Sequence, residues 1–332
     1  MYIKRRRFGY HSKIRRKRVI LTCVVLLAAG SVVTAGIIFL PSFWDNAATD
    51  KRTLLQLWDS GSYSEVYEQS KLSLEAHPLD YFLLTLHGFS AYQVGISQIS
   101  SKNALIYFDD CITSLRKALL LQDSETDDPD IRGRLYYVLG KAYSYKGESY
   151  ANLCINYLEK AKEMSYNAED IPEYLGIAYA SIGDHRSSVA SFIEALEPWK
   201  EGENEISGRS NSQNNPSGLL LFSIAKSYIA LDDWEMARLY LQHCIAISQD
   251  SRLIMPAKLL LAEILIYSGD LDNARNYIQD ILTENGEIAE AHFFMGEIYA
   301  QQGENARARN EWRTALSIDP AHTKARSRLA LQ

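Results

Sequence analysis

Cysteine is scarce in this chain: there are four among 332 residues, and no two of them form a CxxC pair. Cys23 lies in a long uncharged run, and the other three are Cys111, Cys154 and Cys244. Three cysteines cannot all pair, and a structural zinc site needs clustered ligands, so the sequence indicates neither a disulfide framework nor zinc. We expect these three cysteines to act as small buried hydrophobic residues.

The chain also lacks the motifs that carry common chemistries. It contains no Gly-rich phosphate loop, no GxSxG and no HExxH. The histidines are scattered: His87, His243 and His292 lie in predicted helices without a second histidine four residues later. The acidic run 123–130 lacks the spaced ligands and central glycine of an EF-hand. We therefore predict that the protein is not an enzyme and that it has no metal, no cofactor and no small-molecule substrate.

Acidic residues are absent from the first 40 positions. Residues 1–18 contain nine Lys or Arg, and residues 19–40 form a run of 22 without a charge. At a rise of about 1.5 Å per residue this run spans about 33 Å, enough for the hydrocarbon layer of a membrane. Phe43 and Trp44 follow, as is typical of a membrane interface. We predict a basic cytoplasmic segment at 1–18 and a transmembrane helix at 19–40.

The charge bias across this run predicts its orientation. On the far side the nearest positive charges are Lys51 and Arg52. The positive-inside rule then places the N-terminus in the cytoplasm. The expected location is the inner (cytoplasmic) membrane, single-pass, with the rest of the chain periplasmic or otherwise extracytoplasmic.

A cleaved secretory signal is the alternative. A run of 22 apolar residues is longer than a typical signal core, and the small-x-small pattern at 33–35 is followed by more apolar residues. A lipoprotein site at Cys23 is disfavoured because Thr22 precedes it. Binding of the basic segment to anionic lipid or nucleic acid is a further alternative, although topology explains that segment more simply.

Beyond the uncharged run the balance is acidic. Residues 41–332 hold 26 Lys and Arg against 41 Asp and Glu, a formal charge of −15. Such a surface disfavours nucleic acid and is compatible with basic or unfolded protein partners.

A 34-residue period runs through this acidic region. In residues 289–322 a small residue is followed by a large one, a turn glycine, a small–large–small series and a proline: Gly296, Tyr299, Gly303, Ala308, Trp312, Ala315 and Pro320. Residues 255–288 repeat the order with Ala262, Leu265, Gly269, Ala274, Ile278 and Ile281. Small residues let two antiparallel helices approach closely, and glycine ends a helix in a left-handed conformation at little cost. A hairpin of this kind must stack on neighbours to bury its apolar face.

This pattern resembles the tetratricopeptide repeat, or TPR. The resemblance implies an all-α fold: a TPR-type α-solenoid of antiparallel helix hairpins in a right-handed superhelix, with no sheet, after the transmembrane helix. We predict seven units, of which the first three are degenerate: 47–80, 81–123, 133–168, 169–202, 218–251, 255–288 and 289–322. Residues 323–332 are predicted to form a C-terminal tail. Three surface loops are expected, at 96–103, 122–130 and 201–217.

In this family the first helix of each unit lines a concave groove that holds a protein or peptide partner. The candidate groove residues are Phe82, Phe89, Tyr92, Tyr137, Lys141, Tyr145, Phe222, Lys226, Tyr267 and Phe293. Rigid aromatic side chains are favoured interface anchors, although any one of these residues could instead pack against the next unit. Some members clamp a carboxylate with Lys, Asn and Arg, but here no Asn accompanies Lys141 and Lys226. The sequence therefore favours an aromatic groove over a charge clamp.

Together these features predict a membrane-anchored TPR scaffold or adaptor for protein–protein interactions in the cell envelope. Its layout resembles that of N-anchored TPR proteins that assist protein translocation or the assembly of envelope complexes. The alternatives are a self-associating structural tether and an accessory subunit that positions a partner enzyme.

Overall fold

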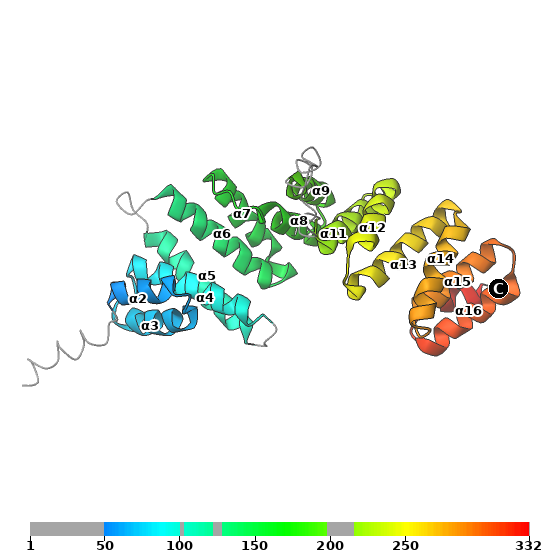
Figure 1. The fold of residues 1–332 in the computed structure, drawn as a ribbon, viewed down its shortest axis with the longest axis horizontal. Helices are drawn as coiled ribbons and strands as arrows, with labels where there is room; N and C mark the ends of the chain where they lie inside the picture. The colour runs from blue at the N-terminus through cyan, green and yellow to red at the C-terminus, as the bar shows by residue number, and fades with distance from the viewer. Residues whose placement is uncertain (1–49, 100–102, 122–127, 198–215, 332) are drawn as a thin grey trace, which may run out of the picture. The chain divides into compact units, whose positions relative to one another are not determined.

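The computed structural model describes residues 50–99, 103–121, 128–197 and 216–331. These residues form helices, and none of them lies in a strand (Figure 1). The chain divides into two compact units, residues 1–127 and 128–332, which we describe separately. The predicted basic segment and transmembrane helix lie outside the described residues. Within the described ranges no helix is long and apolar enough to cross a membrane.

The first unit contains four described helices, which pack in sequence order: α2 Lys51–Asp59, α3 Tyr63–Ala76, α4 Tyr81–Ser97 and α5 Ala104–Leu121. A small apolar cluster of Leu54, Val66, Leu83 and Leu86 joins α2, α3 and α4. Gly88 faces Leu115 where α4 crosses α5. Because α4 continues to Ser97, the loop expected at 96–103 starts two residues later than predicted.

A buried polar cluster also holds α3, α4 and α5 together. His87 is 5% exposed, and its ring stacks on Tyr67 with the centroids 4.8 Å apart. His87 Nδ1 lies 3.0 Å from Ser70 Oγ, and Tyr67 donates a hydrogen bond of 2.6 Å to Asp110. Burial lowers the pKa of His87, which favours the neutral ring. This histidine is therefore a packing residue, as its isolation in the sequence indicated.

The second unit is a continuous series of hairpins. Its elements are α6 Pro129–Tyr145, η1 Glu148–Tyr150, α7 Ala151–Glu163, α8 Ile171–Ser181, α9 His185–Ala195, α11 Gly218–Ala230, α12 Trp234–Ile247, α13 Ser251–Ser268, α14 Leu271–Glu284, α15 Ala289–Gln301, α16 Asn305–Ile318 and α17 Thr323–Ala330. Helices α8, α11, α13 and α15 each pack on their own second helix and on the preceding hairpin, and α6 packs on α7. The prediction of an all-helical TPR-like solenoid is thereby confirmed.

The small residues stand at the helix crossings, as predicted. A Cβ added to Gly140 would lie 2.6 Å from Leu158 Cδ2, and one added to Gly296 would lie 2.5 Å from Trp312 Nε1. Trp312 is only 1% exposed, so it fills the space beside Gly296. These contacts explain why the first helix carries no larger side chain at these two positions.

The turns between paired helices use left-handed residues. Gly183, Gly269 and Gly303 have φ of 80°, 82° and 79°. At the same position of the α11–α12 turn stands Asp232, with φ of 57°. An L-residue with a side chain is strained there by about 1–2 kcal/mol, and less for Asp than for most residues.

We therefore expect Asp232→Gly to stabilise the protein by about 0.5–1 kcal/mol, because relief of strain exceeds the added entropy of the unfolded chain. The thermal midpoint should rise by a few degrees in a circular dichroism melt. The reverse exchange at the equivalent turn, Gly269→Asp, should lower it. A fall in the midpoint of Asp232→Gly would show that the aspartate side chain stabilises this turn.

Three boundaries of the second unit differ from prediction. Helix α6 begins at Pro129, after its cap Asp128, so the loop expected at 122–130 ends two residues early and the repeat predicted from 133 begins four residues early. Helix α13 begins at Ser251, four residues before the predicted unit start, because Asp250 caps it and Pro256 is tolerated inside it. The residues predicted as a C-terminal tail form α17 instead. Ala325 of α17 is fully buried, and its backbone N–H donates to His322 Nδ1 at 3.2 Å. The stack therefore continues one helix beyond Pro320.

Candidate partner-binding groove

The first helices of successive hairpins lie side by side in the second unit. Contacts join α6 to α8, α8 to α11, α11 to α13, and α13 to α15. Ion pairs extend the series from α15 and α13 to α17. We call the surface formed by α6, α8, α11, α13, α15 and α17 the first-helix face. Seven of the ten candidate residues belong to helices of this face.

The other three candidates belong to α4 in the first unit. Phe82 is half-buried under the ammonium of Lys51, which lies 5.1 Å from the ring centroid. The ring of Phe89 is also half-buried and lies 6.4 Å from that of Trp58. Tyr92 is only 5% exposed and packs near Phe108. Tyr92 is therefore a core residue, and it offers little surface to a partner.

At the start of the first-helix face the candidates form a polar cluster. Tyr137 donates hydrogen bonds of 2.9 and 3.1 Å to the two oxygens of Asp170, across the gap between α6 and α8. Lys141 Nζ lies 2.5 Å from Asp170 Oδ2 and 3.0 Å from the Tyr137 hydroxyl. The same ammonium lies 4.7 Å from the ring centroid of Tyr174, whose hydroxyl is 2.9 Å from that of Tyr145. Three predicted groove residues thus contact one another or share partners.

The electrostatics of this cluster oppose a role in binding carboxylates. Burial works against the charge on Lys141, but the hydrogen bonds and charges of Asp170 and Tyr137 together outweigh it, and the pKa of Lys141 is raised. Burial, with Asp170 nearby, raises the pKa of Tyr137 to about 12. Burial and then Asp170 also raise the pKa of Glu173. The positive charge of Lys141 is therefore balanced by Asp170 within the protein.

The middle of the face is more apolar. Phe222 on α11 is half-buried and packs on the main core, while Lys226 is exposed. Among the described residues Lys226 has no ion-pair partner. Ile177 on α8 and Leu219 on α11 are 39% and 50% exposed. These side chains give a partner apolar surface with one positive charge among them.

At the C-terminal end two candidates come together in a cavity. Tyr267 of α13 and Phe293 of α15 line a space of about 370 Å³, with Ile266, Phe294 and Leu331. Tyr267 is 77% exposed at its edge, whereas Phe293 is 5% exposed and forms part of its wall. We call this space the C-terminal cavity.

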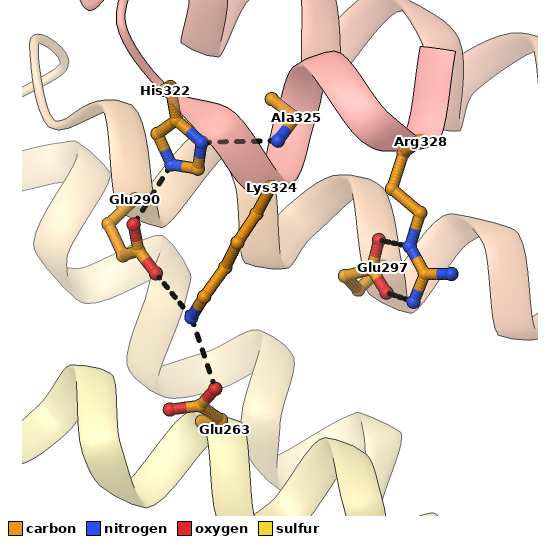
Figure 2. A network of polar contacts seen from close by, with 7 residues as sticks. All are labelled: Glu263, Glu290, Glu297, His322, Lys324, Ala325 and Arg328. Atoms are coloured by element: carbon orange, nitrogen blue, oxygen red, sulfur yellow. Dashed lines mark hydrogen bonds and ion pairs between the residues drawn. The ribbon is translucent and has the colours of Figure 1, made fainter. Parts of the chain in front are cut away.

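A network of charges borders the C-terminal cavity (Figure 2). Lys324 of α17 lies 3.3 Å from Glu263 Oε1 and 3.2 Å from Glu290 Oε1. His322 Nε2 lies 2.9 Å from the other oxygen of Glu290. This network fixes α17 against α13 and α15.

The second ion pair of this border is bidentate. Arg328 donates from Nε and Nη2 to the two oxygens of Glu297, at 2.9 and 2.5 Å. A fork of this geometry is stronger than a single contact between exposed charges. Both carboxylate oxygens of Glu297 are therefore already paired within the protein.

The sequence missed Lys324, Arg328 and Leu331 as residues of this face. The signal for them was the period itself: Lys324 follows Glu290 by one period of 34 residues, and so falls on the first helix of a further repeat. The polar composition of 323–332 and the proline before it concealed that register.

Metal ligands and thiols were the remaining candidates for chemistry in the part of the chain that the structure describes. They contain no group of His, Cys, Asp and Glu arranged to hold a metal ion. Cys111, Cys154 and Cys244 are buried and unpaired. Burial raises the pKa of the Cys154 thiol to about 12, which keeps it protonated and unreactive.

A family model for the tetratricopeptide repeat matches residues 259–322, which include most of α13 and all of α14, α15 and α16. These residues are similar to tetratricopeptide repeats. No curated protein sequence matches it. The TPR fold is typically a non-catalytic interaction fold, and these comparisons indicate no enzyme family.

Solved structures, two of them described as TPR proteins, share the fold of the chain at low sequence identity. The C-terminal part of a TPR repeat-containing protein from Cytophaga hutchinsonii is 14% identical, with a TM-score of 0.54 over 83% of this chain and 98% of that one. PilF of Pseudomonas aeruginosa is 12% identical, with a TM-score of 0.52 over 74% and 97%. YrrB, described as a TPR protein with an unusual peptide-binding site, is 18% identical, with a TM-score of 0.51 over 65% and 97%.

Proposed function

We propose that this TPR protein is an interaction scaffold that binds a protein or peptide partner on the first-helix face. The observation that carries the proposal is the C-terminal cavity, an open space bordered by the exposed ring of Tyr267 on a face that also exposes Ile177 and Leu219. Exposed aromatic and aliphatic side chains around a concave site are typical of interaction surfaces. The peptide-binding site named for YrrB, which shares the fold, supports the same reading.

The partner is held by apolar anchors rather than by a charge clamp. Lys141 is paired with Asp170, and Lys324 and Arg328 are paired with glutamates. Of the two lysines predicted in the groove, only Lys226 is exposed. One isolated ammonium cannot give the two-point recognition that a carboxylate clamp needs.

The proposal predicts unequal effects of substitutions in a pull-down of the native partner. Tyr267→Ala and Phe222→Ala should each weaken binding about thirtyfold, or about 2 kcal/mol, because each removes an anchor. Lys141→Ala with Lys226→Ala should weaken it less. Affinity purification from detergent-solubilised membranes first identifies the partner.

Trp234→Ala is the matched control, because Trp234 is 44% exposed but lies on the second helix α12. All variants should first show unchanged circular dichroism spectra. Loss of binding in the double lysine variant alone, with Tyr267→Ala and Phe222→Ala still binding, contradicts the apolar anchors. Recovery of only further copies of this chain would favour a self-associating tether.

We further propose that residues 19–40 anchor the scaffold in the inner membrane, with the repeats on the extracytoplasmic side, where it assists translocation or the assembly of envelope complexes. The support is the nine basic residues before the uncharged run. Protease added to intact spheroplasts should digest the repeats. Protection until the membrane is lysed would contradict this orientation.

A further inference from the structure

We propose that the C-terminal cavity binds a basic and apolar segment of the partner polypeptide. One large apolar side chain of that segment enters the cavity, and a neighbouring Lys or Arg pairs with Glu263. The inference rests on the proposed function and adds to it the place and the chemistry of recognition.

The apolar half of the recognition follows from the walls of the cavity. Phe293 and Phe294, which are 5% and 4% exposed, form a rigid inner wall from α15. Tyr267 and Leu331 line the opening and are 77% and 79% exposed. Two large apolar side chains so exposed beside an open space, whose lining also includes Gln301, Ser327 and charged groups, favour a partner that covers them. A volume of about 370 Å³ leaves room for a large side chain of that partner.

The basic half follows from an imbalance of charge at the border. A single ammonium, that of Lys324, serves the carboxylates of both Glu263 and Glu290. Glu263 uses only Oε1 for this contact, and within the described residues no donor reaches its Oε2. Glu297, by contrast, has both oxygens filled by Arg328. Glu263 is therefore the carboxylate of this border that can accept a further cation.

Lys324 shows within the molecule that this surface suits a cation. Its ammonium lies 5.7 and 5.5 Å from the ring centroids of Phe293 and Phe294, between the two carboxylates (Figure 2). Carboxylates beside aromatic faces attract ammonium and guanidinium groups. The formal charge of −15 beyond residue 40 acts in the same direction. An acidic segment would meet the opposite field, so we assign the basic class.

The test uses the full-length protein and short fluorescein-labelled Gly/Ser peptides with a four-residue core. One peptide has the core Leu-Lys-Lys-Leu, the second Leu-Glu-Glu-Leu and the third Ser-Lys-Lys-Ser. Fluorescence polarisation at about 150 mM salt should show binding of the first, with the second and third at least about tenfold weaker.

Protein variants then locate the site. Tyr267→Ala should weaken binding of the first peptide at least about tenfold, and Glu263→Gln by about fivefold or more. Glu263→Gln should also reduce the preference for Leu-Lys-Lys-Leu over Leu-Glu-Glu-Leu. Trp234→Ala on α12 and Glu304→Gln at the start of α16 are matched controls that should bind as the parent does. Thermal melts confirm that all four variants fold.

Three results would overturn this inference: equal binding of the acid and basic peptides, unchanged binding by Tyr267→Ala, or no binding of any peptide up to about 1 mM. Self-association of the protein that Tyr267→Ala abolishes would also overturn it, because the occupant would then be a second copy.

Capture of the native partner distinguishes failure of this inference from failure of the proposed function. If its capture depends on Phe222 but not on Tyr267 and Glu263, only the present inference fails; if no substitution on the first-helix face affects capture, the proposed function fails as well.

Discussion

Replacing Gly296 with leucine is expected to destabilise the last hairpin of the second unit by about 3 kcal/mol, through overpacking. A Cβ at this position would lie 2.5 Å from Trp312 Nε1 and 3.1 Å from the carbonyl oxygen of Ala308. Trp312 is enclosed at 1% exposure and Ala308 contributes backbone, so neither yields easily. Helices α15 and α16 must therefore separate. The midpoint of a circular dichroism melt should fall by about 6–12 °C.

Gly286→Leu provides the matched control. Gly286 lies in the exposed turn before α15, and the only atom within reach of an added Cβ is the carbonyl oxygen of Leu282 at 3.7 Å. Its midpoint should change by less than about 2 °C. Hydrogen exchange should show that Gly296→Leu loses protection first in α15 and α16. A parental melt of Gly296→Leu would mean that the two helices do not cross at this glycine. Gly176→Leu should act similarly at Phe192.

The helix crossings could be predicted because they depend on short spacings within one hairpin. Gly296 and Trp312 lie on adjacent helices joined by a short turn, so the repeat pattern alone brings them together. The same holds for Gly140 and Leu158 in the third predicted repeat, even though η1 precedes the second helix of that repeat. The same period places Asp232 at the turn position that Gly269 and Gly303 occupy, and its φ of 57° agrees.

Contacts between neighbouring repeats could not be predicted in the same way. Lys141 and Tyr137 were recognised as inward-facing, but their shared partner Asp170 belongs to the next unit and to a loop position before α8. The sequence showed a lysine available to a ligand, whereas the structure shows one already paired. Tyr92 failed for a related reason: in a degenerate unit the inward position of the consensus became part of the core.

Helix α17 was missed because only two of its side chains, Ala325 and Leu329, pack on the apolar core. Ala325 is its one fully buried side chain, while Lys324 and Arg328 hold it through glutamates on α13 and α15. Two packed apolar side chains in a helix of eight residues are too short a pattern to predict it from hydrophobic spacing. The border of the C-terminal cavity, and with it the inferred cation site, therefore emerged only in three dimensions.

A double-mutant cycle at the last crossing should show strong coupling between Gly296 and Trp312. The preceding repeat has Ala262 and Ile278 at the equivalent positions, and both are fully buried. There an alanine stands in place of glycine, and the smaller isoleucine stands in place of tryptophan. Gly296→Ala should cost about 1–3 kcal/mol by overpacking. Trp312→Ile should cost about 2–4 kcal/mol by loss of buried volume. The double variant reproduces the Ala262–Ile278 combination, in which the added methyl group occupies space that the indole has left.

The free energy of unfolding of the double variant, measured in urea, should therefore be about 1–2 kcal/mol higher than the sum of the single effects predicts. Gly286→Ala combined with Trp312→Ile is the control cycle and should be additive within about 0.5 kcal/mol, because Gly286 does not contact Trp312. If the effects of Gly296→Ala and Trp312→Ile were also additive, the indole of Trp312 would not be the reason that position 296 needs a glycine. The alternation of small and large residues between hairpins would then need a cause other than the closeness of their helices.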